Sequence, residues 1–387
     1  MKWLLPTIAF GLLGFGFKGS DKPQTAAEVT VIISGGAKGH LSPCGCTKPM
    51  SGGLKRLATI VRNMKAKGNV IWIDTGDIID VPGRQSQMKA ETYGELLGSL
   101  GIDAVAYTSR DAQQGVGLLY AASPLSKKKW LTPISDPTMP TISEATVGGL
   151  TVSATNNQAL QIEGEKGTDV LMFDGPRTAA EGLRELHEMV VYSSEGIPTV
   201  SGSKVSPGSN LRGVIMATFR GKKFVAAKVI SLEPSVKDDA QADKIYQNYL
   251  SRVTQERLID TVSKNSSEDF AGSVNCKSCH GKVYQQYAKT KHAHAYESLV
   301  KEGHQADPDC VSCHVVGLDS SKGFYYEKTK NLAQVGCESC HGAGREHARN
   351  PRSVHLPKVT EKQCISCHTP SNSPTFVFKT YWKKIKH

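Results

Sequence analysis

The sequence predicts two folded parts, an α/β domain followed by a mainly α, loop-rich domain. Strand-like and helical patterns alternate from Val29 to about Pro234, which is typical of a sheet packed between helices. Beyond Asn265 the composition changes, because Cys, His and Lys become frequent and all eight methionines lie before this point. The 387 residues also fit two or three domains, at roughly 100–200 residues each.

The N-terminus has the layout of a secretory signal peptide. Lys2 precedes an apolar stretch over 3–17, and polar residues follow. We expect residues 1–27 to be the signal peptide, with an uncleaved anchor as the alternative. The stretch is shorter than the roughly 20 residues of a membrane-spanning helix. We therefore expect a periplasmic or otherwise exported protein that is not integral to a membrane once the peptide is cleaved.

The first domain is predicted over 28–235 from short elements in chain order. Apolar runs predict strands, and apolar residues at helical spacing predict helices. The strands are expected at 30–33, 70–73, 104–106, 150–154, 169–173, 214–219 and 223–230, and the helices at 53–67 and 89–100.

The segment 236–268 is interpreted as a helical linker. It is polar and helix-prone from Asp238 to Ser263, with apolar positions at Ile245, Leu250, Val253, Leu258 and Val262. The second domain is then predicted over 269–387.

The second domain repeats one pattern, Cys-x-x-Cys-His, four times. This is the attachment pattern of c-type haem. Two thiols three positions apart can bond one porphyrin, and the following histidine then ligates the iron. Paired zinc sites do not require that histidine, and a disulfide framework does not require the spacing. The sequence predicts four covalent haem c groups on Cys276, Cys279 and His280; Cys310, Cys313 and His314; Cys337, Cys340 and His341; and Cys364, Cys367 and His368.

The second axial ligands are expected to be mostly histidines. The region from residue 270 onward contains no methionine, so it cannot supply His/Met coordination. Haems with two histidine ligands have lower potentials than His/Met haems. Six further histidines are available, of which we expect two or three to be non-ligands: His292, His294, His304, His347, His355 and His387.

This region resembles the tetrahaem cytochrome c-554 family over 273–387. The resemblance is carried by Gln285-Gln286-Tyr287 with the later His-Ala-His-Ala at 292–295, by the third motif with its Gly-Ala-Gly-Arg-Glu-His extension, and by the aromatic tail. It implies that His292 and His347 are distal ligands, and His387 could complete the fourth haem. No distal match is evident for the haem on His314, which in this family can be five-coordinate. His304 and His355 are its local candidates.

The first domain is similar to the 5′-nucleotidase branch of the metallophosphoesterases. The resemblance is carried by the segments 41–46 and 52–59 and by Ile73-Asp74-Thr75-Gly76-Asp77. That family holds two metal ions, but here Gly36 and Lys38 replace an Asp and a His, and Ser109 and Arg110 replace an Asn-His pair. Only Asp77 fits, and one carboxylate is a poor site for two divalent ions. The resemblance implies an α/β, metallophosphoesterase-like sandwich, and we expect a retained scaffold without hydrolase activity.

Two cysteines lie outside the repeats, at Cys44 and Cys46. An oxidised pair, a metal site and a redox pair near the haems all remain open for them.

The expected function is electron transfer between unidentified redox partner proteins, so a carrier is expected rather than a catalyst. The alternatives are an oxidoreductase that acts on a small nitrogen or sulfur species at an open haem on His314, and a phosphoesterase. The formal charge of +11 first suggests nucleic acid or an anionic membrane surface as a partner. However, 17 Lys and Arg against 9 Asp and Glu lie between residues 270 and 387. Haem propionates would offset this excess, so nucleic acid is not an expected partner.

Overall fold

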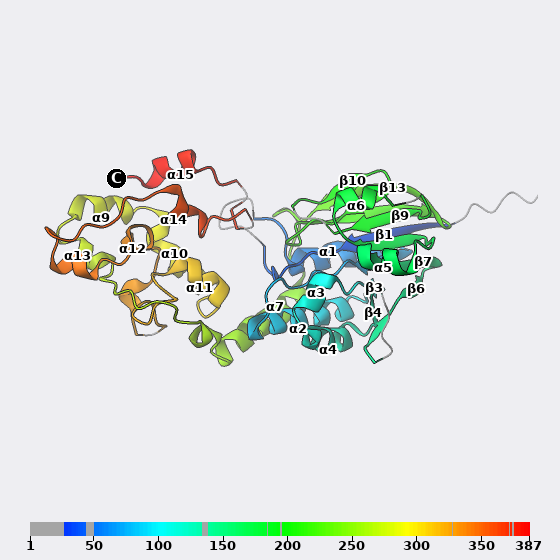
Figure 1. Cartoon of the computed structure of the whole chain (residues 1–387), viewed down its shortest axis with the longest axis horizontal. Coiled ribbons are helices and arrows are strands. Elements are labelled where there is room, and N and C mark those ends of the chain that lie inside the picture. The colour runs from blue at the N-terminus through cyan, green and yellow to red at the C-terminus, as the bar shows by residue number, and fades with distance from the viewer. Residues whose placement is uncertain are drawn as a thin grey trace, which may run out of the picture.

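The computed structural model describes residues 27–43, 50–133, 138–183, 185–193, 196–326, 328–370, 372–373 and 375–387. The predicted signal peptide, except for Ala27, and the pair Cys44 and Cys46 lie outside these residues. Figure 1 shows an α/β lobe and a helical lobe side by side, which confirms the predicted fold classes. Within the described ranges, no helix is both long and apolar enough to cross a membrane.

The first domain contains two large sheets, which agrees with the sandwich that its resemblance to the metallophosphoesterases implied. Their strand orders are β13-β12-β1-β2-β3 and β10-β11-β9-β8-β7-β6, and β4 pairs with β5. The strands are β1 Glu28–Ser34, β2 Val70–Asp74, β3 Ala104–Val105, β4 Trp130–Leu131, β5 Thr141–Ile142, β6 Glu144–Val147, β7 Leu150–Asn156, β8 Val170–Asp174, β9 Met189–Tyr192, β10 Thr199–Ser201, β11 Lys204–Ser206, β12 Gly213–Arg220 and β13 Lys223–Ser231.

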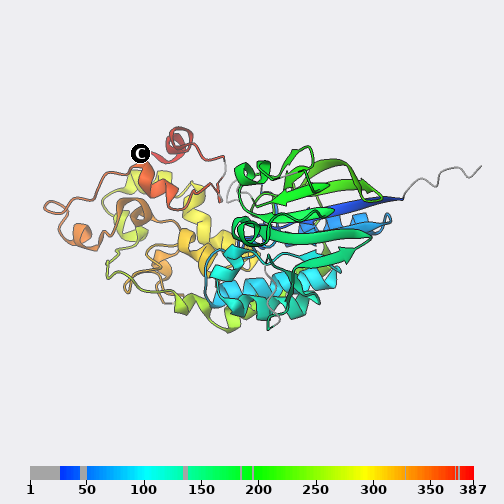
Figure 2. The same cartoon turned by 45° about the vertical axis from the view of Figure 1, so that its right-hand side comes forward.

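Alternating side chains explain how the two sheets pack. Successive residues of a strand point to opposite faces. In β1, Val31 and Ile33 join the core between the sheets, whereas Ile32 joins the core under the helices. On the outer face of the second sheet, Phe173 and Tyr192 form another small core. The domain is therefore a layered sandwich of helices, sheet, sheet and helices (Figure 2).

The helices of this domain include several short ones that the sequence pattern did not predict. The segment around Thr108 begins one of them, because its hydroxyl and the Asp111 carboxylate form a capping box. The helices are α1 Leu54–Lys65, α2 Arg84–Ser99, α3 Ser109–Gln113, α4 Val116–Ser126, α5 Asn157–Glu163 and α6 Arg177–Glu181.

The predicted linker is part of the first domain's packing. Helix α7, Ala240–Gln255, buries Ile245, Tyr249 and Val253 in the core shared with α1 and α2. A 3-10 turn, η1 Leu258–Thr261, follows, and Val262 packs on the second domain's core. The apolar positions were correctly identified, but they anchor the helix to the first domain rather than leaving it as a connection.

The second domain is mainly α and rich in loops. The helices described there are at most 8 residues long, and its apolar core is small, around Phe270, Val311 and Phe324. The helices are α8 Ser273–Cys276, α9 Gly281–Tyr287, η2 Lys291–His294, α10 Ala295–Glu302, α11 Pro308–His314, η3 Lys330–Leu332, α12 Cys337–His341, α13 Arg345–Arg349, α14 Glu361–Ile365 and α15 Phe378–Ile385.

Candidate functional site

The four Cys-x-x-Cys-His motifs lie on short helical segments, in or directly after α8, α11, α12 and α14. Residues three and four positions apart share one helix face, so each motif can present its two sulfur atoms together. The start of α11 has a clear local cause. The Asp307 side chain accepts a hydrogen bond from the N–H of Asp309, and Pro308 occupies the first helical turn.

Three of the four motif histidines face a second histidine. The ring centres are 6.3 Å apart for His280 and His347, 6.2 Å for His292 and His368, and 5.7 Å for His341 and His387. A histidine nitrogen lies about 2 Å from a metal that it ligates, so ring centres across one ion are about 6 Å apart. The three pairs therefore fit an iron between them.

Hydrogen bonds orient several of these rings. Nδ1 of His347 lies 2.6 Å from the carbonyl oxygen of Val354, and Nδ1 of His314 lies 2.7 Å from that of Ala295. A ring that donates from Nδ1 leaves Nε2 free to ligate a metal. Burial also lowers the pKa values of His292, His314, His341 and His368, which favours the neutral, metal-binding form.

His314 differs from the other three motif histidines. Within the described residues, its ring is not paired with a second histidine ring at these distances. Its candidate ligand His304 lies beside the attachment cysteine instead, with Nδ1 at 3.6 Å from the Sγ of Cys310 and Nε2 at 3.5 Å from the hydroxyl of Tyr246. The other candidate, His355, is exposed. The structure therefore brings neither candidate opposite His314.

The placement of His387 differs from the sequence expectation. Its ring lies against His341 of the third motif, whereas His292 lies against His368 of the fourth. One cause is the anchoring of the C-terminal segment, because the Gln286 side chain donates a hydrogen bond to the carbonyl oxygen of Lys386 at 2.7 Å.

The sulfur atoms reveal the spatial order of the motifs. The thiol group of Cys276 lies beside that of Cys337, and the thiol group of Cys313 lies beside that of Cys367. Helix α12 packs against both α8 and α14. The motifs therefore follow one another in space as first, third, fourth and second. Sequence order alone could not give this arrangement.

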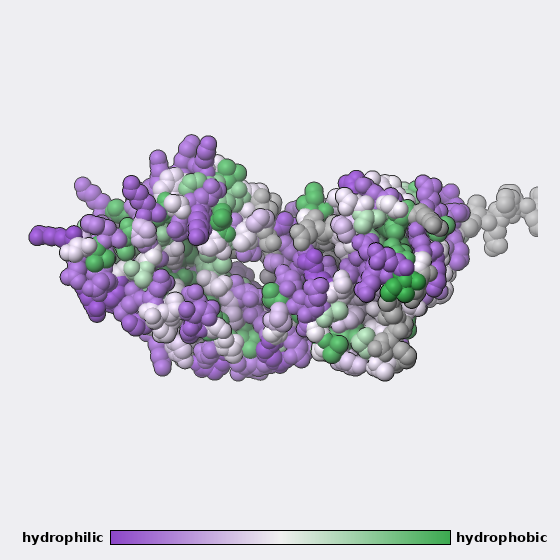
Figure 3. All heavy atoms as spheres, viewed as in Figure 1, coloured by the Kyte–Doolittle hydropathy of each residue, from purple (hydrophilic) through white to green (hydrophobic). Residues whose placement is uncertain are grey.

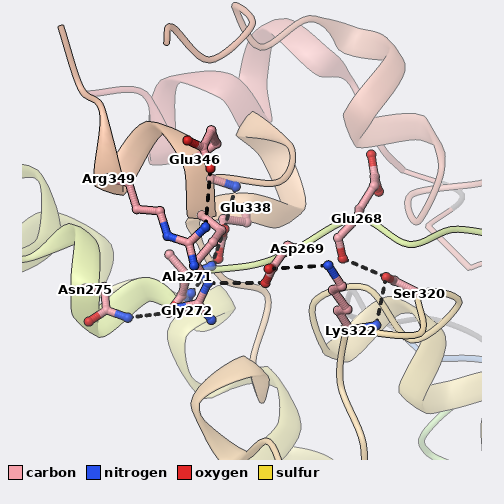
Figure 4. Close-up of polar contacts among 12 residues, drawn as sticks. Glu268, Asp269, Ala271, Gly272, Asn275, Ser320, Lys322, Glu338, Glu346 and Arg349 are labelled. Carbon is pink, nitrogen blue, oxygen red and sulfur yellow. Dashed lines mark hydrogen bonds and ion pairs between the residues drawn. The ribbon is translucent and has the colours of Figure 1, made fainter. Parts of the chain in front are cut away.

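Glu338, inside the third motif, is a site residue that the sequence interpretation missed. Its buried carboxylate accepts hydrogen bonds from the N–H groups of Ala271, Gly272 and Gly344 at 2.7–2.8 Å (Figure 4). It thereby joins the third motif to the segment that leads into the first. The acidic side chain was the sequence signal that could have identified Glu338, since the position after the first cysteine holds Lys, Val and Ile in the other motifs.

The second motif lies at the contact between the domains. Lys89 of α2 pairs with Asp309 of α11, and the side chain of Gln85 donates to a carboxylate oxygen of Asp307 at 2.6 Å. Figure 1 accordingly places α11 next to α2 and α7, with α9 and α13 at the opposite end of the lobe.

His304, Asp307 and Cys310 form a cluster of metal-ligating atoms within 4.8 Å of one another, the one such group found among the described residues. Cys310 belongs to a haem-attachment motif, and a thioether sulfur there would not be a thiolate ligand. The cluster therefore does not fit a separate metal site in a haem-loaded chain.

The first domain has a cavity of about 570 Å³ at the ends of β2, β8 and β9. Its lining includes Asp77, whose carboxylate lies 3.7 Å from the guanidinium of Arg110, and Asp174. Burial raises the pKa of Asp77, and the nearby arginine opposes that shift. A cationic side chain beside this carboxylate does not suit a pair of divalent cations. The residues present do not fit the two-metal centre of a metallophosphoesterase.

Comparisons with solved structures give distant similarities to nucleotidases over the N-terminal region. A 5′-nucleotidase precursor from Thermus thermophilus is 14% identical with a TM-score of 0.48, over 63% of this chain and 62% of that one. The NAD nucleotidase of Haemophilus influenzae is 13% identical with a TM-score of 0.46, over 64% and 63%. A 5′-nucleotidase from Candida albicans is 11% identical with a TM-score of 0.43, over 68% and 66%. The chain thus spans less than two thirds of the first two structures' lengths.

No curated protein sequence matches the chain. One family model does match, described as cytochrome c554 and c-prime, over residues 275–342. The match agrees with the resemblance read from the motifs and covers the first three of them. The segment 275–342 is therefore of the cytochrome c554 type, which implies covalently attached haem c.

Proposed function

We propose that the protein is an exported tetrahaem c-type cytochrome that transfers electrons between redox partner proteins. The observation that carries this proposal is the pairing of three motif histidines with His292, His347 and His387. A site built only for haem attachment would not need a second imidazole opposite each of them. Four motifs further support four haems per chain.

The chain's residues would do three things in this function. The motif cysteines would hold each porphyrin, the paired histidines would ligate the iron, and backbone carbonyls orient several of the rings. The haem itself supplies the one-electron redox chemistry when bound. Bis-histidine ligation leaves no coordination position for substrate, so it favours electron transfer over catalysis.

The direct test is the haem content and spin state of the purified protein. A pyridine haemochrome assay is expected to give about four haems per chain, in line with four motifs. Electron paramagnetic resonance is expected to show three low-spin haems and one high-spin haem. This matches three paired rings and, among the described residues, no second histidine ring opposite His314. A purified protein without covalent haem would overturn the proposal.

The environment of His314 supports a second candidate function, reduction or oxidation of a small nitrogen or sulfur species at an open haem. Neither His304 nor His355 lies opposite the ring of His314. Binding of carbon monoxide or nitric oxide to one haem per chain, with turnover of nitrite, hydroxylamine or sulfite, would favour the enzyme. Four low-spin haems would exclude it.

A phosphoesterase remains the least supported function, since Arg110 lies beside Asp77 in the first domain's cavity. We expect no metal-dependent hydrolysis of nucleoside monophosphates with Mg²⁺, Mn²⁺ or Zn²⁺.

A further inference from the structure

The haem domain has a strongly basic face built from two segments that lie far apart in the sequence. Residues 273–296 contain four lysines and no acidic residue, and residues 375–387 likewise contain four lysines and no acidic residue. The hydrogen bond from Gln286 to Lys386 holds the two segments together. The basic face consists of Lys277, Lys282, Lys289, Lys291, Lys379, Lys383, Lys384 and Lys386.

These lysines are exposed and are not neutralised by neighbouring carboxylates. All eight are exposed, and none forms an ion pair with an Asp or Glu among the described residues. Figure 3 shows hydrophilic side chains projecting over α15 and α9. Elsewhere on the chain, exposed lysines such as Lys222 and Lys223 pair with acidic residues. The basic face therefore carries eight exposed lysines without a carboxylate partner among the described residues.

Haem propionates account for only part of this charge. The haems on the first, third and fourth motifs, which the two segments contact, would add about six propionates, against eight lysines. The excess would attract an acidic partner and accelerate its encounter at low salt.

The face also includes the end of the haem row that is open to a partner. The first and third motifs begin the spatial order, with His280 exposed in the described structure. The second motif, at the other end, is covered by the first domain through Lys89 and Asp309. Val274, 63% exposed and close to Cys276, supplies apolar surface at the first motif. An apolar centre with a polar rim is the usual anatomy of a docking interface.

We propose that this basic face is the docking surface for an acidic electron-transfer protein, which exchanges one electron at a time with the haem on His280. In the reducing direction, the partner loses one electron and the ferric iron gains it, with no proton or bond change. This inference rests on the proposed tetrahaem function, and it adds the place and the charge of the partner.

The test measures reduction of the holoprotein by a plant-type [2Fe–2S] ferredoxin, an acidic donor with a potential near about −400 mV. The docking variant is K277Q/K282Q/K383Q/K384Q. The control variant K127Q/K128Q/K129Q/K228Q removes the same charge from exposed positions on the first domain. Stopped-flow absorbance at low ionic strength is expected to show about tenfold slower reduction of the docking variant only, and the difference should vanish at high salt.

Each other outcome has a defined meaning. Equal slowing of both variants would mean that only the net charge of the protein affects the rate. Unchanged rates in both variants would mean that the basic face does not bind the donor. Either result overturns the inference. Loss of binding to phosphatidylglycerol vesicles by the docking variant, with unchanged ferredoxin kinetics, would assign the face to a membrane instead. Shifted haem potentials in the docking variant, with no change in salt dependence, would assign the lysines to propionate neutralisation. Haem content is measured on the same samples, so failure of the tetrahaem proposal is detected separately.

Discussion

Glu338 Oε2 accepts a hydrogen bond of 2.7 Å from the backbone N–H of Gly272, 66 residues earlier in the chain. Gly272 has a φ of 85°, a left-handed conformation that favours glycine, and its N–H points at the carboxylate (Figure 4). The contact fixes the first haem motif against the third. The close thiols of Cys276 and Cys337 are the consequence of this junction.

Replacement of Glu338 by Ala is expected to destabilise the haem domain by about 2–4 kcal/mol, because three N–H donors would lose their buried acceptor. Urea unfolding of the holoprotein, followed by the Soret band, measures this change. Glu338→Gln is the matched control, since one amide oxygen still accepts and should recover part of the loss. Equal stability of wild type and E338A would contradict the structural role of the carboxylate.

The His341–His387 pair predicts the effect of removing the C-terminal histidine. In His387→Ala the haem on His341 should become high-spin, so carbon monoxide binding to the reduced protein should rise from one to two haems per chain. Magnetic circular dichroism identifies the change in spin state. His355→Ala is the control, because that side chain is exposed. An effect on the His368 haem instead would support the sequence expectation over the structural placement.

Asp111 predicts a pH dependence of the first domain's stability. Burial, followed by the nearby Asp77 charge, raises the pKa of this carboxyl from 3.8 to about 7. A carboxyl with a raised folded-state pKa stabilises the fold at low pH, and this contribution is lost as pH rises from about 4 to about 7. Urea unfolding followed by far-UV circular dichroism should therefore show a flatter pH profile for Asp111→Asn.

The side-chain amide oxygen introduced by this substitution could still accept from the N–H of Ile78, as Asp111 does at 2.8 Å. The variant thus separates ionisation from hydrogen bonding. Because burial also raises the pKa values of Asp74 and Asp77, the unfolding free energy of D111N is expected to retain some dependence on pH. If the unfolding free energy of the wild type and of D111N changed identically with pH, Asp111 would be ruled out as a source of the pH dependence.

The ion pair between Lys89 and Asp309 predicts a modest coupling between the domains. Lys89 is 13% exposed and Asp309 57%, so the pair is only partly shielded from water. Asp309→Asn should lower the free energy of unfolding of the holoprotein by about 1 kcal/mol. The exposed pair of Arg177 and Glu181 offers a control, since Glu181→Gln should change it by less than about 0.5 kcal/mol. Equal losses of unfolding free energy in D309N and E181Q would mean that the ion pair between the domains stabilises the protein no more than an exposed pair does.

Local patterns predicted much of the fold because they depend on neighbouring residues. Apolar runs identified β1 and β2, and helical spacing identified α1, since its buried positions Leu54, Leu57 and Val61 share one face. The same patterns carry no information on strand partners, so the two-sheet sandwich was expected from the resemblance to the metallophosphoesterases and not from the apolar runs. The helix at α7 was recognised, but its packing partner was not.

The sequence by itself determined the chemistry of attachment, because the spacing of two cysteines and a histidine matches one porphyrin whatever the fold around it. It also limited the distal ligands to histidines, since methionine is absent from the region. Only the tertiary structure decided which histidines meet, because His292 and His368 are separated by 75 intervening residues and are joined by chain folding alone. Three features depend on the same long-range packing: the lack of a second histidine ring opposite His314 among the described residues, the spatial order of the motifs, and the assembly of the basic face from two remote segments.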